Sequence, residues 1–399
     1  MRVLLLNQTF YPDTPATSLY LTPLAEQLVR QGHEVTVLTG RRAYDDFSRL
    51  FPAHETWRGV EIVRVWNTGF GYGAKWRKAL DFFTFLFSAS IRSLFLRRFD
   101  LVVALTSPPL LSVLGAGLAF LWWAQFIHWV MDLNPDEAIA VGWLRSEGLA
   151  ARFLEAASRW SLHRADRVIV LDDFMGDRVL AKGVVGEKIE VNSLWMQNEG
   201  IFNAKKREQF RRAHGLENKY VVMYAGNHTP CHPLDTLIGA VRVLCQEPKI
   251  HFCFIGFGHE WGRLRDLART ERWVNALFLG YQPIASGLLS AADTQMVVMG
   301  DPFVGIIHPC KIYNILAARR PFVYIGPEPS HVSDIIREAG LEGLAASFQH
   351  GESEALAEEL RQRAEGKALP LWPAAEKFQK WSETAVIEKM VSILESTAL

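Results

Sequence analysis

Short apolar segments alternate with amphipathic segments along this chain, and that alternation limits the folds it can adopt. "RVLLLN" at residues 2–7 has the pattern of a strand, and "HEVTVLTG" at 33–40 has the pattern of the next one. Between them, "SLYLTPLAEQLVRQG" has apolar residues at helical spacing and ends at a glycine, which is typical of a helix C-terminus. Strand–helix–strand units form parallel sheets through right-handed crossovers. The first half is therefore predicted to be a doubly wound domain.

The alternation restarts in the second half, after a polar and irregular segment at residues 196–218. The strand patterns there include "KYVVMYAGN", "IHFCFIGFG", "TQMVVMG" and "PFVYIG", with helical patterns between them. A chain of 399 residues is also too long for one ordinary core. We predict an α/β protein of two Rossmann-like doubly wound domains, at residues 1–200 and 201–375, facing an interdomain cleft. A C-terminal helix at 376–399 is expected to pack back on the N-terminal domain.

Composition limits the possible partners and the compartment. The chain has 43 basic and 43 acidic residues and no basic tail, so nothing points to nucleic acid. The four cysteines all lie in the second half and form no CxxC pair, which favours a reducing cytosolic compartment. The N-terminal apolar run is short and lacks a small-residue cleavage site, so it is expected to be a buried strand rather than a signal peptide.

Two apolar segments raise the question of a membrane. Residues 110–133 are long enough to span a bilayer, but we expect a buried helix at about 110–123 and a strand at about 126–131. "KWRKALDFFTFLFSASIRSLFLRR" at 75–98 is densely aromatic and is basic at both ends. That composition favours an interfacial helix on an anionic membrane surface. A core helix with solvated ends is the alternative.

The stretch "GNHTPCHPLDTL" at 226–237 holds three metal-ligand residue types, His228, Cys231 and His232. A metal site needs three or four converging ligands, and two prolines stiffen this loop. The stretch also lies between a strand pattern and a helix pattern, with Pro233 suited to the first helical position. The amide groups at such a helix start attract anions. A phosphate-binding turn is therefore favoured, with a structural loop and a metal site as alternatives.

The order and spacing of several motifs resemble one known family. The motifs are "FYPD", "LAEQLVRQGHEVTVLTG", "FDLVVALTSPPL" and "DLNPDEAIAVG" in the first half, and "YAGN", "FIGFGHE", "FLGYQP", "LSAADTQMVVM" and "HPCKIYNILAARRPFVYIG" in the second. Together they resemble GT-B glycosyltransferases of family GT4, in the branch that builds bacterial surface polysaccharides. The resemblance implies a hexosyltransferase that uses a nucleotide diphosphate sugar, with retention and without a metal or other cofactor. It also implies a lipid-linked or glycan acceptor at the cytosolic face of the membrane.

The resemblance places the donor on the C-terminal domain. It implies that the turn with Gly226, Asn227, His228 and His232 holds the donor phosphates, although this loop and helix carry no Lys or Arg before Arg242. The two histidines are then the local cationic candidates. Lys311, at a predicted helix start, supplies a further cation. The turn with Gly256 and Glu260 is expected under the nucleobase, or is only a structural turn.

The chain departs from the family at its Glu-x7-Glu pattern, where the two carboxylates are missing. Ile306 and Asn314 occupy those positions. Asn314 can still bond a ribose hydroxyl, and Ile306 and Ile307 can offer backbone amides to the sugar or phosphate. The departure leaves two alternatives open: a non-catalytic GT-B subunit that binds a nucleotide sugar or a partner transferase, and a sugar-nucleotide epimerase.

The acceptor side is expected in the first domain. Asp132 follows a central strand, so it is a catalytic candidate that could position or deprotonate the acceptor hydroxyl or stabilise a cationic transition state. His128 is a second candidate or a satisfied core histidine, and Asp136 could cap the next helix. Thr17 and Ser18 follow the first strand and could cap a helix or contact a ligand.

Overall fold

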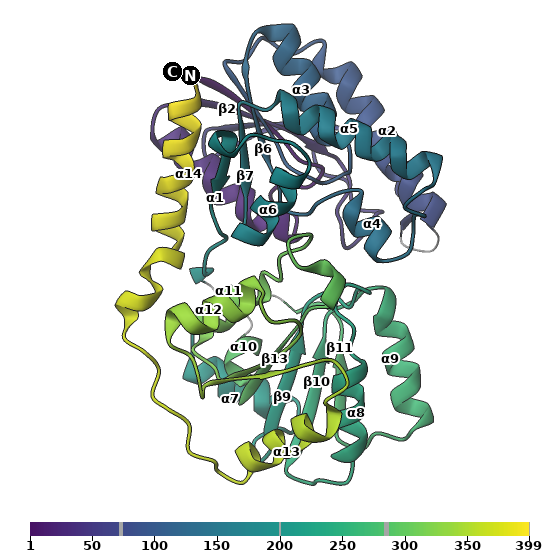
Figure 1. Cartoon of the computed structure of the whole chain (residues 1–399), viewed down its shortest axis with the longest axis vertical. Helices are drawn as coiled ribbons and strands as arrows, with labels where there is room; N and C mark the ends of the chain where they lie inside the picture. The colour runs from purple at the N-terminus through teal and green to yellow at the C-terminus, as the bar shows by residue number, and fades with distance from the viewer. Residues whose placement is uncertain (72–74, 199–200, 283–286, 399) are drawn as a thin grey trace. The chain divides into compact units, whose positions relative to one another are not determined.

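The computed structural model describes residues 1–71, 75–198, 201–282 and 287–398 (Figure 1). The chain divides into two compact units. Unit 1 contains Met1–Ser193, Gly305–His308 and Thr384–Leu399, and unit 2 contains Leu194–Val304 and Pro309–Glu383. The segment Gly305–His308 therefore belongs to unit 1, although the sequence places it within the predicted second domain.

Unit 1 is built on an eight-stranded sheet in the order β3-β4-β2-β1-β5-β6-β7-β8. All neighbouring strands are parallel except β3, which runs antiparallel to β4. The strand order reverses direction between β1 and β5, so ligands are expected at the carboxyl ends near these two strands. The strands are β1 (Arg2–Leu6), β2 (Glu34–Gly40), β3 (His54–Trp57), β4 (Val60–Val65), β5 (Leu101–Ala104), β6 (Gln125–Trp129), β7 (Arg167–Val170) and β8 (Ile189–Val191).

Helices cover both faces of this sheet. In Figure 1, α2, α3 and α5 lie on one side of it, with α3 in contact with the other two, and α1 and α14 lie on the other side. The helices are α1 (Ala16–Arg30), α2 (Lys75–Ser93), α3 (Leu111–Trp122), α4 (Asp136–Ala140), α5 (Leu149–Arg164), α6 (Asp173–Ala181) and α14 (Glu383–Ala398). The C-terminal helix thus begins at Glu383, not at 376, because residues Ala375–Trp381 form a separate 3₁₀ helix, η6, in unit 2.

The apolar segment at residues 110–133 is divided as predicted. It forms α3, then a residue in the left-handed conformation, Trp123, and then β6. Within the described ranges, no helix has both the length and the hydropathy needed to cross a bilayer.

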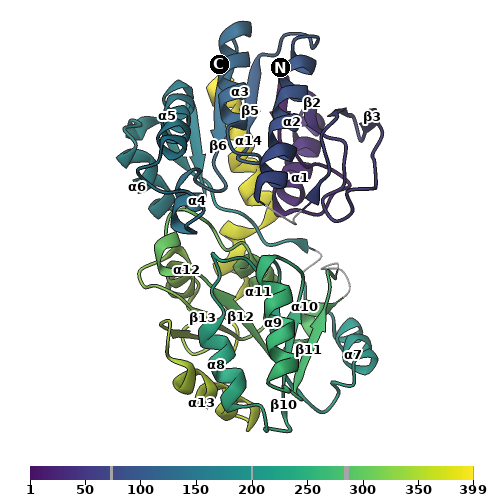
Figure 2. The same cartoon turned by 90° about the vertical axis from the view of Figure 1, so that its right-hand side faces the viewer.

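Unit 2 is built on a six-stranded parallel sheet in the order β11-β10-β9-β12-β13-β14 (Figure 2). Its strand order reverses between β9 and β12. The strands are β9 (Tyr220–Ala225), β10 (Ile250–Ile255), β11 (Ala276–Leu279), β12 (Thr294–Val298), β13 (Phe322–Ile325) and β14 (Ala345–Phe348). The two sheets confirm the predicted α/β class with two doubly wound domains.

Two apolar clusters hold the helices of unit 2 on its sheet. One cluster joins the sheet to α8, α9 and α13, and the other joins it to α7, α10 and the end of α11. The helices are α7 (Ala204–Ala213), α8 (Asp235–Val243), α9 (His259–Thr270), α10 (Leu288–Ala291), α11 (Lys311–Ala318), α12 (His331–Ala339) and α13 (Ser353–Ala364). Helix α8 begins at Asp235, so the prediction that Pro233 opens this helix is wrong by two residues.

Candidate functional site

Two glycine turns pack against each other at the carboxyl ends of β9 and β10. The amide of Gly226 donates to the carbonyl of Ile255 at 2.9 Å, and the amide of His228 donates to that of Phe257 at 3.0 Å. A Cβ atom on Gly256 would lie 2.2 Å from the carbonyl oxygen of Gly226, and both residues have positive φ values. The close backbone contact therefore requires glycine at these positions.

The side chain of Lys311 lies over this pair of turns. Lys311 is the first residue of α11, as predicted, and its Nζ donates to the Tyr224 hydroxyl oxygen at 2.5 Å. The same Nζ is 3.8 Å from the centre of the Tyr224 ring, a cation–π contact. A Cβ atom on Gly226 would approach Lys311 Cε to 2.4 Å. The Lys311 side chain therefore fits against this turn only because residue 226 is a glycine.

The charge on Lys311 is not balanced by a carboxylate among the residues that the structure describes. Burial lowers the pKa of Lys311 from 10.5 to about 7. An ammonium group that is largely removed from water is disfavoured unless an anion binds next to it. The cluster of Lys311, Tyr224 and the two glycine turns therefore has the chemistry of an anion site.

The two histidines of the turn are not cations. Burial lowers the pKa of His228 to about 3, with Lys311 adding to the effect, and burial also holds the pKa of His232 well below its usual value. The prediction that they supply positive charge is therefore wrong, because the fold removes them from water. Neither ring nitrogen of His228 makes a hydrogen bond of normal geometry with a described residue, so a neutral N–H is available to a ligand oxygen.

The metal alternative for this turn is not supported by its geometry. Within the described part of the chain, the ligand atoms of His228, Cys231 and His232 do not converge on one point.

The other predicted donor residues lie in different surroundings. Asn314 is on α11, one turn after Lys311, and its Oδ1 is buried with no partner among the described residues. Glu260 lies in the first turn of α9, and its carboxylate accepts from Arg263 on the same helix at 2.6 Å. Asn227 is exposed, and its carbonyl accepts from the Tyr224 hydroxyl at 3.1 Å. Tyr224 also belongs to this cluster, as its contacts with Lys311 show, and no local sequence pattern identified it.

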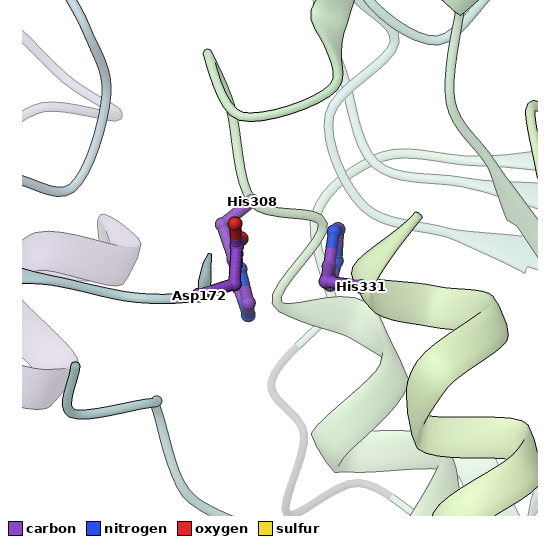
Figure 3. A group of neighbouring side chains, drawn as sticks. All are labelled: Asp172, His308 and His331. Atoms are coloured by element: carbon purple, nitrogen blue, oxygen red, sulfur yellow. Dashed lines mark hydrogen bonds and ion pairs between the residues drawn. The ribbon is translucent and has the colours of Figure 1, made fainter. Parts of the chain in front are cut away.

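Ile306 and Ile307 belong to unit 1, not to the donor domain to which they were assigned. The carbonyl of Ile306 accepts from the amide of Leu133 at 2.9 Å. His308 Nδ1 lies 2.7 Å from Asp172 Oδ2, and Figure 3 draws both side chains as sticks. Asp172 also caps α6 by accepting from the amide of Met175 at 2.8 Å.

Replacing Asp172 with alanine should lower the free energy of unfolding by about 1–3 kcal/mol, because it removes a helix cap and leaves buried His308 without its carboxylate. Urea denaturation followed by fluorescence measures the change. Asp173→Ala is the matched control, since Asp173 is the neighbouring, exposed carboxylate. Equal stability of the two variants would show that the Asp172–His308 pair does not hold this segment.

Two of the predicted acceptor residues, His128 and Asp132, line a cavity of about 90 Å³ in unit 1. It lies beyond the carboxyl ends of β5 and β6, between the starts of α3 and α4 and one face of α5. His128, in β6, is buried, and burial lowers its pKa to about 4. Burial also raises the pKa of Asp132 to about 7, with Glu137 adding to this shift and Lys78 opposing it. Thr106 lines the same cavity and was not identified from the sequence.

Local geometry in unit 1 tests the predicted helix-capping roles of Thr17, Ser18 and Asp136. Thr17 and Ser18 lie inside α1, whose N-cap is Pro15, so neither is a cap. The Thr17 hydroxyl lies 3.2 Å from that of Thr9, and Ser18 is buried. Asp136 is the first residue of α4 and pairs with Lys182 at 2.8 Å instead of capping the helix.

Comparison with known proteins agrees with this architecture. A family model described as "Glycosyl transferase 4-like domain" matches residues 17–195. The chain is 25% identical over 263 residues to the probable glycosyltransferase WbjE of Pseudomonas aeruginosa, an alignment that covers 65% of each chain and so just under two thirds of that relative. It is 25% identical over 335 residues to the putative colanic acid biosynthesis glycosyl transferase WcaI of Escherichia coli K12, covering 79% of this chain and 81% of that one.

A solved structure shows the same fold. The crystal structure of Anabaena Alr3699/HepE in complex with UDP-glucose matches 99% of this chain and 100% of its own length, with a TM-score of 0.72 and 16% identity. The family model, the relatives and the fold confirm the resemblance to GT-B glycosyltransferases that the sequence predicted. The chain is therefore similar to GT4-like glycosyltransferases, through a family match over residues 17–195, and it has the GT-B fold.

Proposed function

We propose that the chain transfers a hexosyl group from a nucleotide diphosphate sugar to a hydroxyl of a lipid-linked or glycan acceptor, with retention and without a metal ion. The observation that carries the donor part is the half-buried Lys311 beside the glycine turns, because no described carboxylate balances its charge. The bound UDP-glucose in the Alr3699/HepE structure supports a nucleotide sugar as the donor class. The name of WcaI supports a role in polysaccharide biosynthesis.

In the proposed reaction, an acceptor hydroxyl oxygen bonds to C1 of the sugar while the bond from C1 to the diphosphate oxygen breaks. The nucleoside diphosphate leaves with the electron pair of that bond, and the hydroxyl proton passes to a diphosphate oxygen. Lys311 and neutral N–H groups of His228 and His232 would bind the diphosphate and stabilise the charge that grows on it. Asn314 would bond the ribose, and Asp132 would orient the acceptor hydroxyl.

A donor panel tests this function. The purified chain is incubated with nucleotide sugars that differ in base and sugar, with and without a membrane lipid extract. We expect nucleotide diphosphate release that requires the extract, together with labelled sugar in the lipid fraction. Failure of every nucleotide to bind in a thermal-shift assay would contradict the proposal.

The same panel tests the alternatives. A non-catalytic subunit is favoured by Asn314, since it stands where a carboxylate is expected and its Oδ1 has no described partner. Such a subunit would bind a nucleotide sugar and release no nucleotide with any extract. Nucleotide release or sugar isomerisation without an acceptor would instead indicate hydrolase or epimerase chemistry.

Donor affinity should depend on pH in the direction set by Lys311. Its pKa of about 7 in the unliganded protein means that the ammonium form is present below pH 7, where affinity is expected to be constant. Above that value, binding requires uptake of a proton, so affinity should fall by up to about tenfold per pH unit until the pKa of the complex is reached. Calorimetry in buffers of different ionisation enthalpy measures both the donor affinity and the number of protons taken up on binding. Constant affinity from about pH 6 to pH 9, without proton uptake, would contradict this role.

The membrane part of the proposal rests on exposed apolar side chains in unit 1. Along α2 they recur at helical spacing, while Phe85 and Ala89 on its other face are buried. Trp123, after α3, is 92% exposed. We call this set the apolar surface; its members are Trp76, Phe83, Phe87, Ile91, Phe120, Trp123, Leu149 and Phe153. The three helices that carry it lie on one side of the sheet in Figure 1.

Basic residues border the apolar surface. Arg77, Arg98, Arg152 and Arg164 are exposed, whereas Arg97 pairs with Glu34 at 2.8 Å, and the side chain of Lys75 is outside the described residues. Aromatic residues with arginines are typical of the boundary of an anionic bilayer. We therefore propose a peripheral location on the cytosolic face of the plasma membrane.

The double variant Phe83→Ser, Phe87→Ser should reduce binding to anionic vesicles by about tenfold or more, because each buried Phe contributes roughly 1.5–3 kcal/mol. Co-sedimentation at several salt concentrations measures it, and binding of the parent chain should weaken as salt rises. Val274→Ser is the matched control, since Val274 is 74% exposed in unit 2. Unchanged sedimentation of the double variant would place the contact elsewhere.

A further inference from the structure

The cavity of unit 1 contains polar atoms that the fold leaves without partners. His128 is 5% exposed, and both of its ring nitrogens are buried with no hydrogen-bond partner in the described part of the chain. The hydroxyl oxygen of Thr106 is likewise buried, with no hydrogen-bond partner among the described residues. Buried polar groups are normally paired, and an unpaired one costs about 1–3 kcal/mol. Two such groups that line one cavity with Asp132 indicate a ligand that supplies the missing hydrogen bonds.

The charge of the cavity decides which ligand suits it. Its polar lining includes the carboxyl of Asp132 and the imidazole of His128, which burial keeps neutral, and none of the described lysines or arginines lines it. Lys78 acts on Asp132 from outside the lining, and Glu137 opposes it. A phosphate would therefore meet a carboxyl group and no direct cation, which disfavours it. A neutral hydroxyl group can donate to Asp132 or His128 and accept from Thr106.

The size of the cavity and its remaining lining residues further limit which ligands can bind there. A cavity of about 90 Å³ can hold several water molecules. The same space fits the hydroxyl edge of one sugar but not a whole oligosaccharide. Apolar side chains of the lining, among them Val130, Leu133 and Leu154, suit the C–H groups of a sugar ring. At the rim, Leu110 has φ +72°, a conformation that is uncommon for a residue other than glycine and that recurs at ligand sites.

We propose that this cavity binds the hydroxyl edge of a neutral acceptor sugar, so that the chain extends a glycan already begun instead of placing the first sugar on a lipid phosphate. The inference rests on the proposed glycosyl transfer for its biological meaning. An earlier transferase must supply an acceptor that already carries a sugar, and the product is again a hydroxyl-terminated glycan.

Binding is tested first, because it does not require catalysis. Saturation-transfer NMR of the full chain with octyl glycosides of common hexoses should show sugar protons in contact with the protein. Thr106→Val should weaken the best glycoside about three- to tenfold, which corresponds to one hydrogen bond. Ala138→Leu should abolish its binding by filling the cavity, since Ala138 is part of the lining. Thr270→Val is the control, because Thr270 lies on α9 of unit 2.

Thermal melting separates lost binding from lost folding. The Thr106 hydroxyl has no described partner, so Thr106→Val leaves no buried group orphaned and should melt no lower than the parent. No glycoside binding by the parent, or binding that both Thr106→Val and Ala138→Leu leave unchanged, would overturn the inference.

Transfer is tested second, with the donor found in the panel and two acceptors, polyprenyl phosphate and octyl glycosides. We expect transfer to a glycoside, with an acceptor KM that Thr106→Val raises about three- to tenfold while the donor KM is unchanged. Transfer to polyprenyl phosphate and to no glycoside would overturn the inference and leave the proposed function standing. Glycoside binding that Thr106→Val weakens, with no transfer to either acceptor, would support the cavity and count against the proposed function.

Discussion

Replacing Lys311 with methionine should weaken binding of the nucleotide diphosphate sugar by about 10- to 150-fold, the range expected for a hydrogen bond to a charged group of about 1.5–3 kcal/mol. Methionine is of similar length and keeps the apolar contact with Tyr224 while removing the ammonium group. Because burial depresses the pKa of Lys311, the charge is held at a cost in the unliganded protein. The variant should therefore unfold at a higher temperature than the parent while it binds donor less tightly. Loss of affinity with gain of stability is the signature of a residue retained for function.

Two controls accompany that measurement. Lys219→Met removes a half-buried lysine of unit 2, whose Nζ donates only to the carbonyl of Pro248 among the described contacts, and should leave donor affinity unchanged. Tyr224→Phe removes the hydroxyl that accepts from Lys311 and should weaken donor binding less than Lys311→Met does. A Kd for Lys311→Met within twofold of the parent value would exclude Lys311 from the donor site.

The strands were predictable where burial on both faces left an unmistakable local pattern. The runs that became β1, β9 and β10 are almost entirely apolar, because parallel strands in a doubly wound sheet are covered by helices on each face. β3 was missed because its four residues, "HETW", alternate between exposed and half-buried and lie at the sheet edge. The first residues of helices were predicted less accurately, because a proline such as Pro233 or Pro15 fits several positions near a helix N-terminus.

The site was predictable in part. The position of Lys311 at a helix start and the glycines after β9 and β10 are local features, so the sequence contained them. The neutral state of His228 and the contact of Tyr224 with Lys311 depend on what the fold packs around them, which no local pattern records. Membership of Gly305–His308 in unit 1 has the same origin, since it depends on contacts with Leu133 and Asp172 that are distant in sequence.

Replacing Gly256 with alanine should reduce the rate of sugar transfer by roughly 100-fold, because displacement of a binding group by about 1 Å has an effect of that size. Gly256 has φ +126°, and its new Cβ would lie 2.2 Å from the Gly226 carbonyl oxygen, so the two turns must separate. Gly226 is also the residue against which the Lys311 side chain lies, so the displacement reaches the proposed diphosphate site. Strain at this position should additionally lower stability by about 1–3 kcal/mol.

The matched control for that change is Gly262→Ala, four residues into the following helix. A Cβ atom there meets nothing within 4 Å, and alanine in a helix interior is favoured over glycine by about 0.5–1 kcal/mol. We expect Gly262→Ala to keep parental kinetics with equal or higher stability. Steady-state kinetics with the donor varied would separate the two sites, since Gly256→Ala should raise the donor KM as well as lower kcat. If Gly256→Ala folded with the parent's donor KM and kcat, the contact between the β9 and β10 turns would be structural, and the donor phosphates would have to bind elsewhere in the chain.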